Sequence, residues 1–236
     1  MESMEKKKFP IRRLLAVLLV LAGVGVALYP QGKAWLMKRQ EKQIINEFRE
    51  IVAEGPLVPE ITSSAVATPP PEEVTTMVEN FNDFEDEIVQ WQSDEERREY
   101  LRQYMEGILS VPKIDLEMPI LRGDSEFNLK VGLASLEYAS KIGTGGNYCV
   151  AGHRSRTRGR QFNRLLEVEI GDIIKLTSKT NLYTYEVFDI QLVRHDAMWV
   201  TKPHAEYDSI ITLITCDYRL KPTGRLVVFG KLIDMR

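Results

Sequence analysis

The most reactive side chain in this sequence is the thiol of Cys216, which ends a short run of apolar and β-branched residues, 212–216. Such a run is typical of a buried strand, so the thiol is predicted at a strand tip. Free cysteine is often only a small buried hydrophobe. However, Arg225 follows nine residues later, and His153 stands in an Ala-Gly-His turn upstream. A thiol beside a base and a cation can be a nucleophile near neutral pH.

The run Thr212-Leu213-Ile214-Thr215-Cys216 resembles the TLxTC signature of sortases, the cysteine transpeptidases of Gram-positive cell surfaces. Arg225 falls where that family has its arginine and His153 where it has its histidine, in the family's chain order. The resemblance covers roughly residues 108–233. It implies a mostly β fold, a sortase-like closed β-barrel with short helices. The Gly-His-Arg run and the residues after it, up to Leu165, are similar to class D-like or class A-like enzymes.

The resemblance also implies a reaction. Cys216 would attack the backbone carbonyl of an LPxTG-like sorting signal and form a thioacyl-enzyme, while His153 protonates the departing amine and later deprotonates the incoming one. Arg225 would donate charged hydrogen bonds to the oxyanion or to substrate carbonyls. The acceptor is expected to be an amine of a peptidoglycan precursor or of a pilin, and no cofactor is expected. Three histidines without a carboxylate or thiol at ligand spacing indicate no metal site.

Further residues are candidates for a substrate groove. Thr215 and Arg154 stand directly beside Cys216 and His153 in the sequence. Trp199 and Met198 lie in the 196–209 loop, which is expected to form one wall of the groove. His195 and His204 are interpreted as surface imidazoles. Five arginines follow His153 closely, at positions 154, 156, 158, 160 and 164. They form either a solvated loop or a positive rim that recognises an anionic acceptor or substrate.

The N-terminal segment combines positive charge with a long apolar run. Five basic residues within 1–13 precede the uncharged segment 14–32, which predicts a membrane-spanning anchor. A cleaved signal peptide has the same pattern, but no small-x-small cleavage site follows the apolar run. The basic cluster places the N-terminus in the cytoplasm. The sequence therefore predicts a single-pass protein of the cell membrane with an extracellular catalytic domain.

The rest of the chain is predicted to comprise three segments. Residues 33–71 are a juxtamembrane helix, reaching Glu54, and a Pro-rich linker. Residues 72–107 are a helical appendage, in which Ser93 and Glu96 form a capping box and Gly107 ends the second helix. These helices either pack on the outside of the barrel or form a lid over the active site. Residues 108–236 are the catalytic β-barrel.

Composition limits the function classes. The chain has 236 residues, 44% hydrophobic and 28% charged, with a net charge of -3, which suits one domain with attachments and argues against a nucleic-acid binder. Its two cysteines are too few for a disulfide scaffold, although a Cys149–Cys216 disulfide stays possible from sequence. Two alternative functions also stay open: a Cys-His peptidase of another type, and an anchored β-barrel module that binds partners without catalysis.

Overall fold

The computed structural model describes residues 11–54, 88–155, 157, 159–217 and 224–236. The chain divides into two units, residues 1–39 and residues 40–236, which are described separately. Most of the basic N-terminal tail, the linker 55–71 and the first helix predicted for the appendage lie outside the described residues. Arg156, Arg158 and the 218–223 loop do so as well.

The first unit consists of the N-terminal part of helix α1, which spans Ile11–Ala53 and contains Pro30. Large apolar side chains are exposed along it, including Leu19 (74% exposed) and Val26 (76%). The helix is long and apolar enough to cross a membrane. The sequence predicts an anchor and a juxtamembrane helix here, and the structure joins both into one helix.

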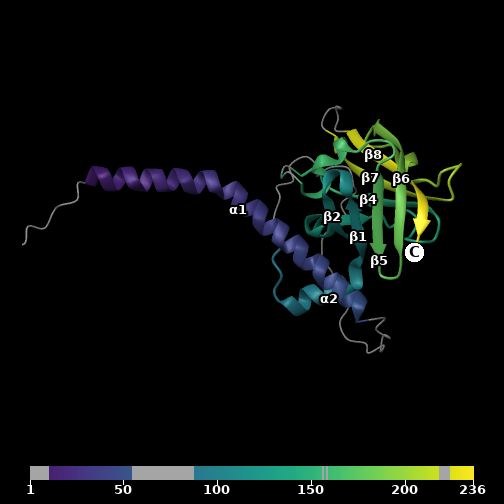
Figure 1. The fold of residues 1–236 in the computed structure, drawn as a ribbon, viewed down its shortest axis with the longest axis horizontal. Helices are drawn as coiled ribbons and strands as arrows, with labels where there is room; N and C mark the ends of the chain where they lie inside the picture. Colours follow the sequence, from purple (N-terminus) through teal and green to yellow (C-terminus); the bar gives the residue numbers. More distant parts are fainter. Residues whose placement is uncertain (1–10, 55–87, 156, 158, 218–223) are drawn as a thin grey trace, which may run out of the picture. The chain divides into compact units, whose positions relative to one another are not determined.

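The second unit contains a closed eight-stranded barrel (Figure 1), with the strand order β1-β2-β3-β4-β7-β8-β6-β5. Its strands are β1 (Met105–Val111), β2 (Leu116–Arg122), β3 (Leu133–Ser135), β4 (Gly146–Ala151), β5 (Ile173–Ser178), β6 (Leu182–Val193), β7 (Ser209–Asp217) and β8 (Gly224–Met235). The short helices between them are η1 (Pro112–Ile114), α3 (Glu126–Val131), η2 (Gln161–Glu167) and η3 (Met198–Thr201). The mostly β, closed-barrel fold predicted from sequence is confirmed.

The barrel interior is filled by alternate residues of the strands, since successive side chains point to opposite faces. On β7 the inward residues are Ile211 and Leu213, and on β8 they are Leu226 and Val228, all fully or almost fully buried in one apolar cluster. Two of the eight neighbouring strand pairs are parallel, β2 with β3 and β4 with β7. The β4–β7 pair brings together strands that lie more than fifty residues apart in sequence.

Helix α2 (Asp94–Tyr104) begins at the predicted capping box, where the hydroxyl of Ser93 accepts from the amide of Glu96 at 3.1 Å. The helix ends at Tyr104, and β1 begins at Met105, so the prediction that Gly107 stops the helix is wrong. Gly107 lies inside β1, where a Cβ atom would come within 2.5 Å of the carbonyl oxygen of Thr177. Pairing with β5 therefore overrides the helix-ending preference of glycine.

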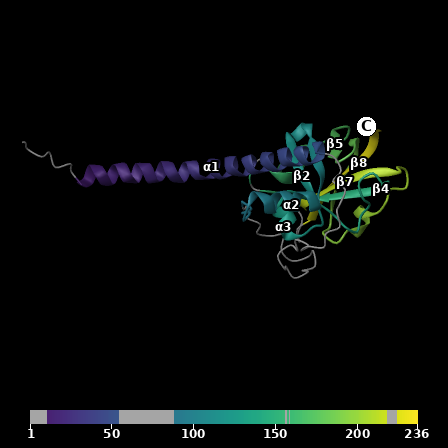
Figure 2. The ribbon, with the colours of Figure 1, turned by 90° about the horizontal axis from the view of Figure 1, so that it is seen from below.

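The C-terminal part of α1 lies beside α2 (Figure 2), and an apolar cluster joins both helices to the barrel strands β1 and β2. Its buried members are Ile44, Ile45, Phe48, Ile51, Tyr100, Leu101, Met105, Ile108, Leu121 and Val131. In the barrel order, β3 and β4 separate β2 from the cysteine strand β7. The described part of the appendage thus packs on the outside of the barrel, which was the first of the two alternatives. Residues 72–87, on which the lid alternative also depends, lie outside the described residues.

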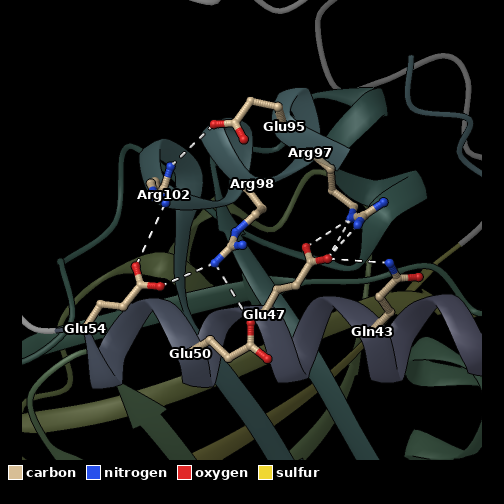
Figure 3. A network of polar contacts seen from close by, with 8 residues as sticks. All are labelled: Gln43, Glu47, Glu50, Glu54, Glu95, Arg97, Arg98 and Arg102. Atoms are coloured by element: carbon tan, nitrogen blue, oxygen red, sulfur yellow. Dashed lines mark hydrogen bonds and ion pairs between the residues drawn. The ribbon is translucent and has the colours of Figure 1, made fainter. Parts of the chain in front are cut away.

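A network of ion pairs reinforces the contact between α1 and α2 (Figure 3). Glu47 of α1 accepts from Nε of Arg97 at 2.9 and 3.1 Å, with side chains 13% and 9% exposed. Two turns farther along α1, Arg98 and Arg102 of α2 reach Glu54 at 3.4 and 3.9 Å, but these groups are more exposed. Burial of the Glu47–Arg97 pair makes it the member on which stability depends most.

We expect Arg97→Leu to lower the free energy of unfolding by about 3 kcal/mol, because it leaves the Glu47 carboxylate largely buried without its guanidinium. Denaturation of the full chain in detergent micelles measures the change. Arg49→Gln is the matched control, since it breaks an ion pair of the same helix, to Glu117, whose side chains are 58% and 50% exposed. That variant should lose less than about 1 kcal/mol. Equal losses in the two variants would contradict the prediction.

Candidate active site

The three predicted catalytic residues lie at one end of adjacent strands. In the antiparallel β7–β8 pair, Cys216 stands directly opposite Arg225. In the parallel β4–β7 pair, Ala151 stands opposite Ile214. His153 comes two residues after Ala151, as Cys216 comes two residues after Ile214. The topology therefore brings together a histidine, a cysteine and an arginine that are separated by up to 72 positions in the chain.

Strand alternation places Cys216 on the outer face of the barrel wall. Its neighbour Thr215 points inward, as Leu213 does two residues earlier, whereas Cys216 points outward, as Ile214 does. Arg225 likewise alternates with the inward Leu226 and shares the outer parity of Val227. The thiol and the guanidinium thus arise on the same side of the barrel wall.

Burial dominates the electrostatics of the thiol. Cys216 is 3% exposed, and desolvation raises its pKa, while the positive charges of Arg225 and Arg154 act in the opposite direction. Because the net direction is upward, the group is a thiol rather than a thiolate at neutral pH. Attack by this sulfur therefore requires a base that removes its proton, and His153 is the imidazole nearest to it in the strand register.

The loop that carries His153 is held tightly. A Cβ atom at Gly152 would come within 2.5 Å of Leu133 and 2.8 Å of Phe162, so only glycine fits there. The His153 amide donates to the side-chain oxygen of Gln161 at 2.9 Å, and the His153 carbonyl accepts from the Phe162 amide at 3.1 Å. Sequence reasoning missed Gln161, because a single glutamine in a loop carries no recognisable signal.

Thr215 ties the cysteine strand to this loop. It is 2% exposed, and its hydroxyl donates to the carbonyl of Gly152 at 2.8 Å. The Gly152 amide in turn donates to the carbonyl of Ile214 at 3.1 Å. The sequence predicts groove contact for Thr215, whereas the hydroxyl is engaged in joining the residue before Cys216 to the residue before His153.

We expect Thr215→Val to lower the free energy of unfolding by about 1 to 2 kcal/mol, because a methyl group of nearly equal size replaces the hydroxyl and removes a buried hydrogen bond. Any catalytic turnover should fall as well, since the two strand ends lose their link. Thermal unfolding of the full chain measures the first effect. Thr215→Ser keeps the hydroxyl and should stay closer to the parent chain; a serine variant as unstable as valine would contradict the hydrogen-bond explanation.

The arginine cluster after His153 does not behave as a unit. Arg154 is partly exposed and lies 3.6 Å from the fully buried carboxylate of Asp217, the residue after the cysteine. Arg164 pairs with Glu167 at 2.6 Å. Arg160 is 5% exposed and pairs with Glu41. For Arg160, both the solvated-loop and the positive-rim predictions are wrong, because its guanidinium is used inside the domain.

The other groove candidates lie on the outer face farther along the sheet. Met198 and Trp199 belong to η3 and are 55% and 53% exposed. The Trp199 ring stacks on Phe229, with ring centroids 6.2 Å apart and planes at 18°. Phe229 pairs with Thr212, four residues and thus roughly 13 Å from Cys216 along β7. An extended peptide of a few residues would span this distance, so groove contact stays a prediction.

The second cysteine does not share this environment. Cys149 is fully buried in a small apolar cluster with Ala134 and Leu136, and burial raises its pKa to about 12. Both cysteines are free thiols. Cys149 pairs with Thr212, four residues before Cys216 on β7. Packing accounts for it, as the sequence suggested for its apolar run.

Comparison with known proteins decides the family. The Sortase domain model matches residues 109–233, just over half of the chain. The chain belongs to the sortase family. The match contains His153, Cys216 and Arg225 and all or most of every barrel strand; β1 begins before it and β8 ends two residues after it.

Two curated relatives and one solved structure illustrate the likeness. This sortase is 35% identical to Sortase A of Bacillus anthracis over 130 residues, 55% of this chain and 60% of the relative. It is 29% identical to Sortase D of Bacillus subtilis over 131 residues, 54% of this chain and 63% of the relative. The crystal structure of Listeria monocytogenes sortase A matches with a TM-score of 0.52 and 32% identity, covering 56% of this chain and 90% of that one. The chain thus aligns with about 60% of the length of these curated relatives.

Proposed function

We propose that this sortase is a membrane-anchored cysteine transpeptidase. Cys216 is the nucleophile, His153 the general acid and base, and Arg225 the donor that stabilises the oxyanion. The proposal depends above all on one observation, the meeting of these residues at the paired ends of β4, β7 and β8. Family membership supports the reaction class.

In the proposed reaction, His153 takes the proton of the Cys216 thiol as sulfur attacks the carbonyl carbon of the scissile peptide bond. Collapse of the tetrahedral intermediate breaks the C–N bond, and His153 returns the proton to the leaving amine. An incoming amine then attacks the thioester and restores the thiol. The substrate is an LPxTG-like sorting signal, and the acceptor is an amine of a peptidoglycan precursor or of a pilin.

The proposed location follows from the apolar part of α1. Residues 14–32 span the cell membrane once, residues 1–13 stay in the cytoplasm, and the barrel domain is extracellular. The length and apolar composition of α1 support the anchor. Residues 40–53, the C-terminal part of α1, belong to the same compact unit as the barrel strands.

A single assay tests the reaction. The full chain in detergent micelles is incubated with an LPxTG-like peptide and triglycine, and products are followed by mass spectrometry. A peptide–triglycine adduct whose formation requires Cys216 is the expected result. Hydrolysis insensitive to triglycine would favour a peptidase, and the absence of thiol-dependent turnover with any acceptor would overturn the proposal.

A further inference from the structure

We propose that Glu41 and Arg160 are positioning residues for His153. The C-terminal part of α1, residues 40–53, is then part of the catalytic apparatus. The inference rests on the proposed function, in which His153 is the general acid and base. It is carried by a chain of largely buried contacts that begins on α1 and ends on both backbone groups of His153.

The first link is a buried ion pair. Nε of Arg160 lies 3.1 Å from the Glu41 carboxylate, and the two side chains are 6% and 13% exposed. Nη2 of the same guanidinium donates to the carbonyl of Lys130, at the end of α3, at 3.1 Å. The planar fork of arginine satisfies both acceptors at once, which a lysine ammonium does less well. Arg160 is therefore fixed in position between α1 and α3.

The second link runs from Arg160 to His153. Gln161 follows immediately and has a φ of 44°, in the left-handed region that a non-glycine residue seldom adopts. The side-chain Nε2 of Gln161 donates to the carbonyl of Leu129 at 2.6 Å, and its side-chain Oε1 accepts from the His153 backbone amide at 2.9 Å. The amide of Phe162 donates to the His153 carbonyl at 3.1 Å. The two residues after Arg160 thus hold both backbone groups of His153.

This geometry has a catalytic consequence. Loss of the Glu41 charge removes the negative charge that lies against this largely buried guanidinium, and we expect the 160–162 segment to shift in response. The shift passes to His153 through its amide and carbonyl. A displacement of about 1 Å at a proton-transfer group can cost on the order of 100-fold in rate. Cys216 and Arg225 are held by β7 and β8 and would keep their places.

The test compares Glu41→Gln and Arg160→Lys with a matched control, Glu47→Gln, in the full chain in detergent micelles. The control also breaks a largely buried ion pair of α1, but its partner Arg97 lies on α2, and the other acidic partner described for Arg97 is Asp94 of the same helix. Each preparation is normalised by alkylation of Cys216. We expect both test variants to lower kcat by at least about tenfold with KM within about twofold, and the control to keep its kcat per titrated thiol while losing stability.

A second readout is independent of activity. The chain contains three histidines, so its imidazole signals are few enough to assign by NMR with a His153→Ala variant. We expect Glu41→Gln and Arg160→Lys to move the His153 signal, and Glu47→Gln to leave it in place. An unchanged kcat and signal in Glu41→Gln, or an equal kcat loss in Glu47→Gln, would overturn the inference. If the parent chain shows no thiol-dependent turnover, the proposed function fails, and the NMR signal alone decides whether Glu41 positions His153.

Discussion

Cys216→Ala is expected to lower the rate of sorting-signal cleavage by at least about 10⁴-fold, because it removes the atom that forms the thioester. The rate is measured with the LPxTG-like peptide and triglycine, both at saturating concentrations. Formation of the acyl-enzyme, seen as a mass increase on the parent chain, should vanish in the variant. Folding should be nearly unaffected, since only the sulfur atom at the end of β7 is lost.

Cys149→Ala is the matched control for this prediction. It also removes one thiol from the same sheet, but Cys149 is fully buried among apolar residues and has a pKa raised to about 12. We expect this variant to keep cleavage within about threefold of the parent chain, because a protonated buried thiol takes no part in the reaction. A large loss in Cys149→Ala, or residual cleavage near the parent rate in Cys216→Ala, would refute the assignment of the nucleophile.

Arg225→Gln is expected to lower kcat by about 10²- to 10³-fold, the usual cost of removing one oxyanion donor. It should also change the reactivity of the thiol. The positive charge of Arg225 lowers the pKa of Cys216 against the effect of burial. Without that charge the pKa rises further, so the pH profile of Cys216 alkylation by iodoacetamide should move to higher pH. Steady-state kinetics and the alkylation profile measure the two effects separately.

Arg225→Lys distinguishes these two roles of the arginine. Lysine keeps the positive charge, so the alkylation profile should stay close to that of the parent chain. It lacks the planar fork of donors, so kcat should still fall, though less than in the glutamine variant. If the lysine variant matched the parent chain in kcat, charge alone would be sufficient, and the proposed hydrogen bonding to the oxyanion would be wrong.

Sequence patterns predicted the closed, mostly β fold and the start of α2. The capping box of Ser93 and Glu96 begins α2 as predicted. Local signals explain this success, because alternation and capping act over a few residues. The three-residue strand β3 has no such signal, because a run so short has no periodicity. Its pairing with β2 and β4 comes only from barrel closure.

Cys216 as nucleophile, with His153 and Arg225 as its partners, was predicted from residue types, chain order and a family signature, because these are properties of the sequence. Their meeting depends on the pairing of β7 with β4 and β8, which no local pattern specifies. The same holds for Arg160, whose charge suggested an exposed loop until the fold brought Glu41 beside it. The reactivity of a single residue type is evident from the sequence. Its burial and its hydrogen-bond or ion-pair partners depend on residues far away in sequence, so only the folded barrel determines them.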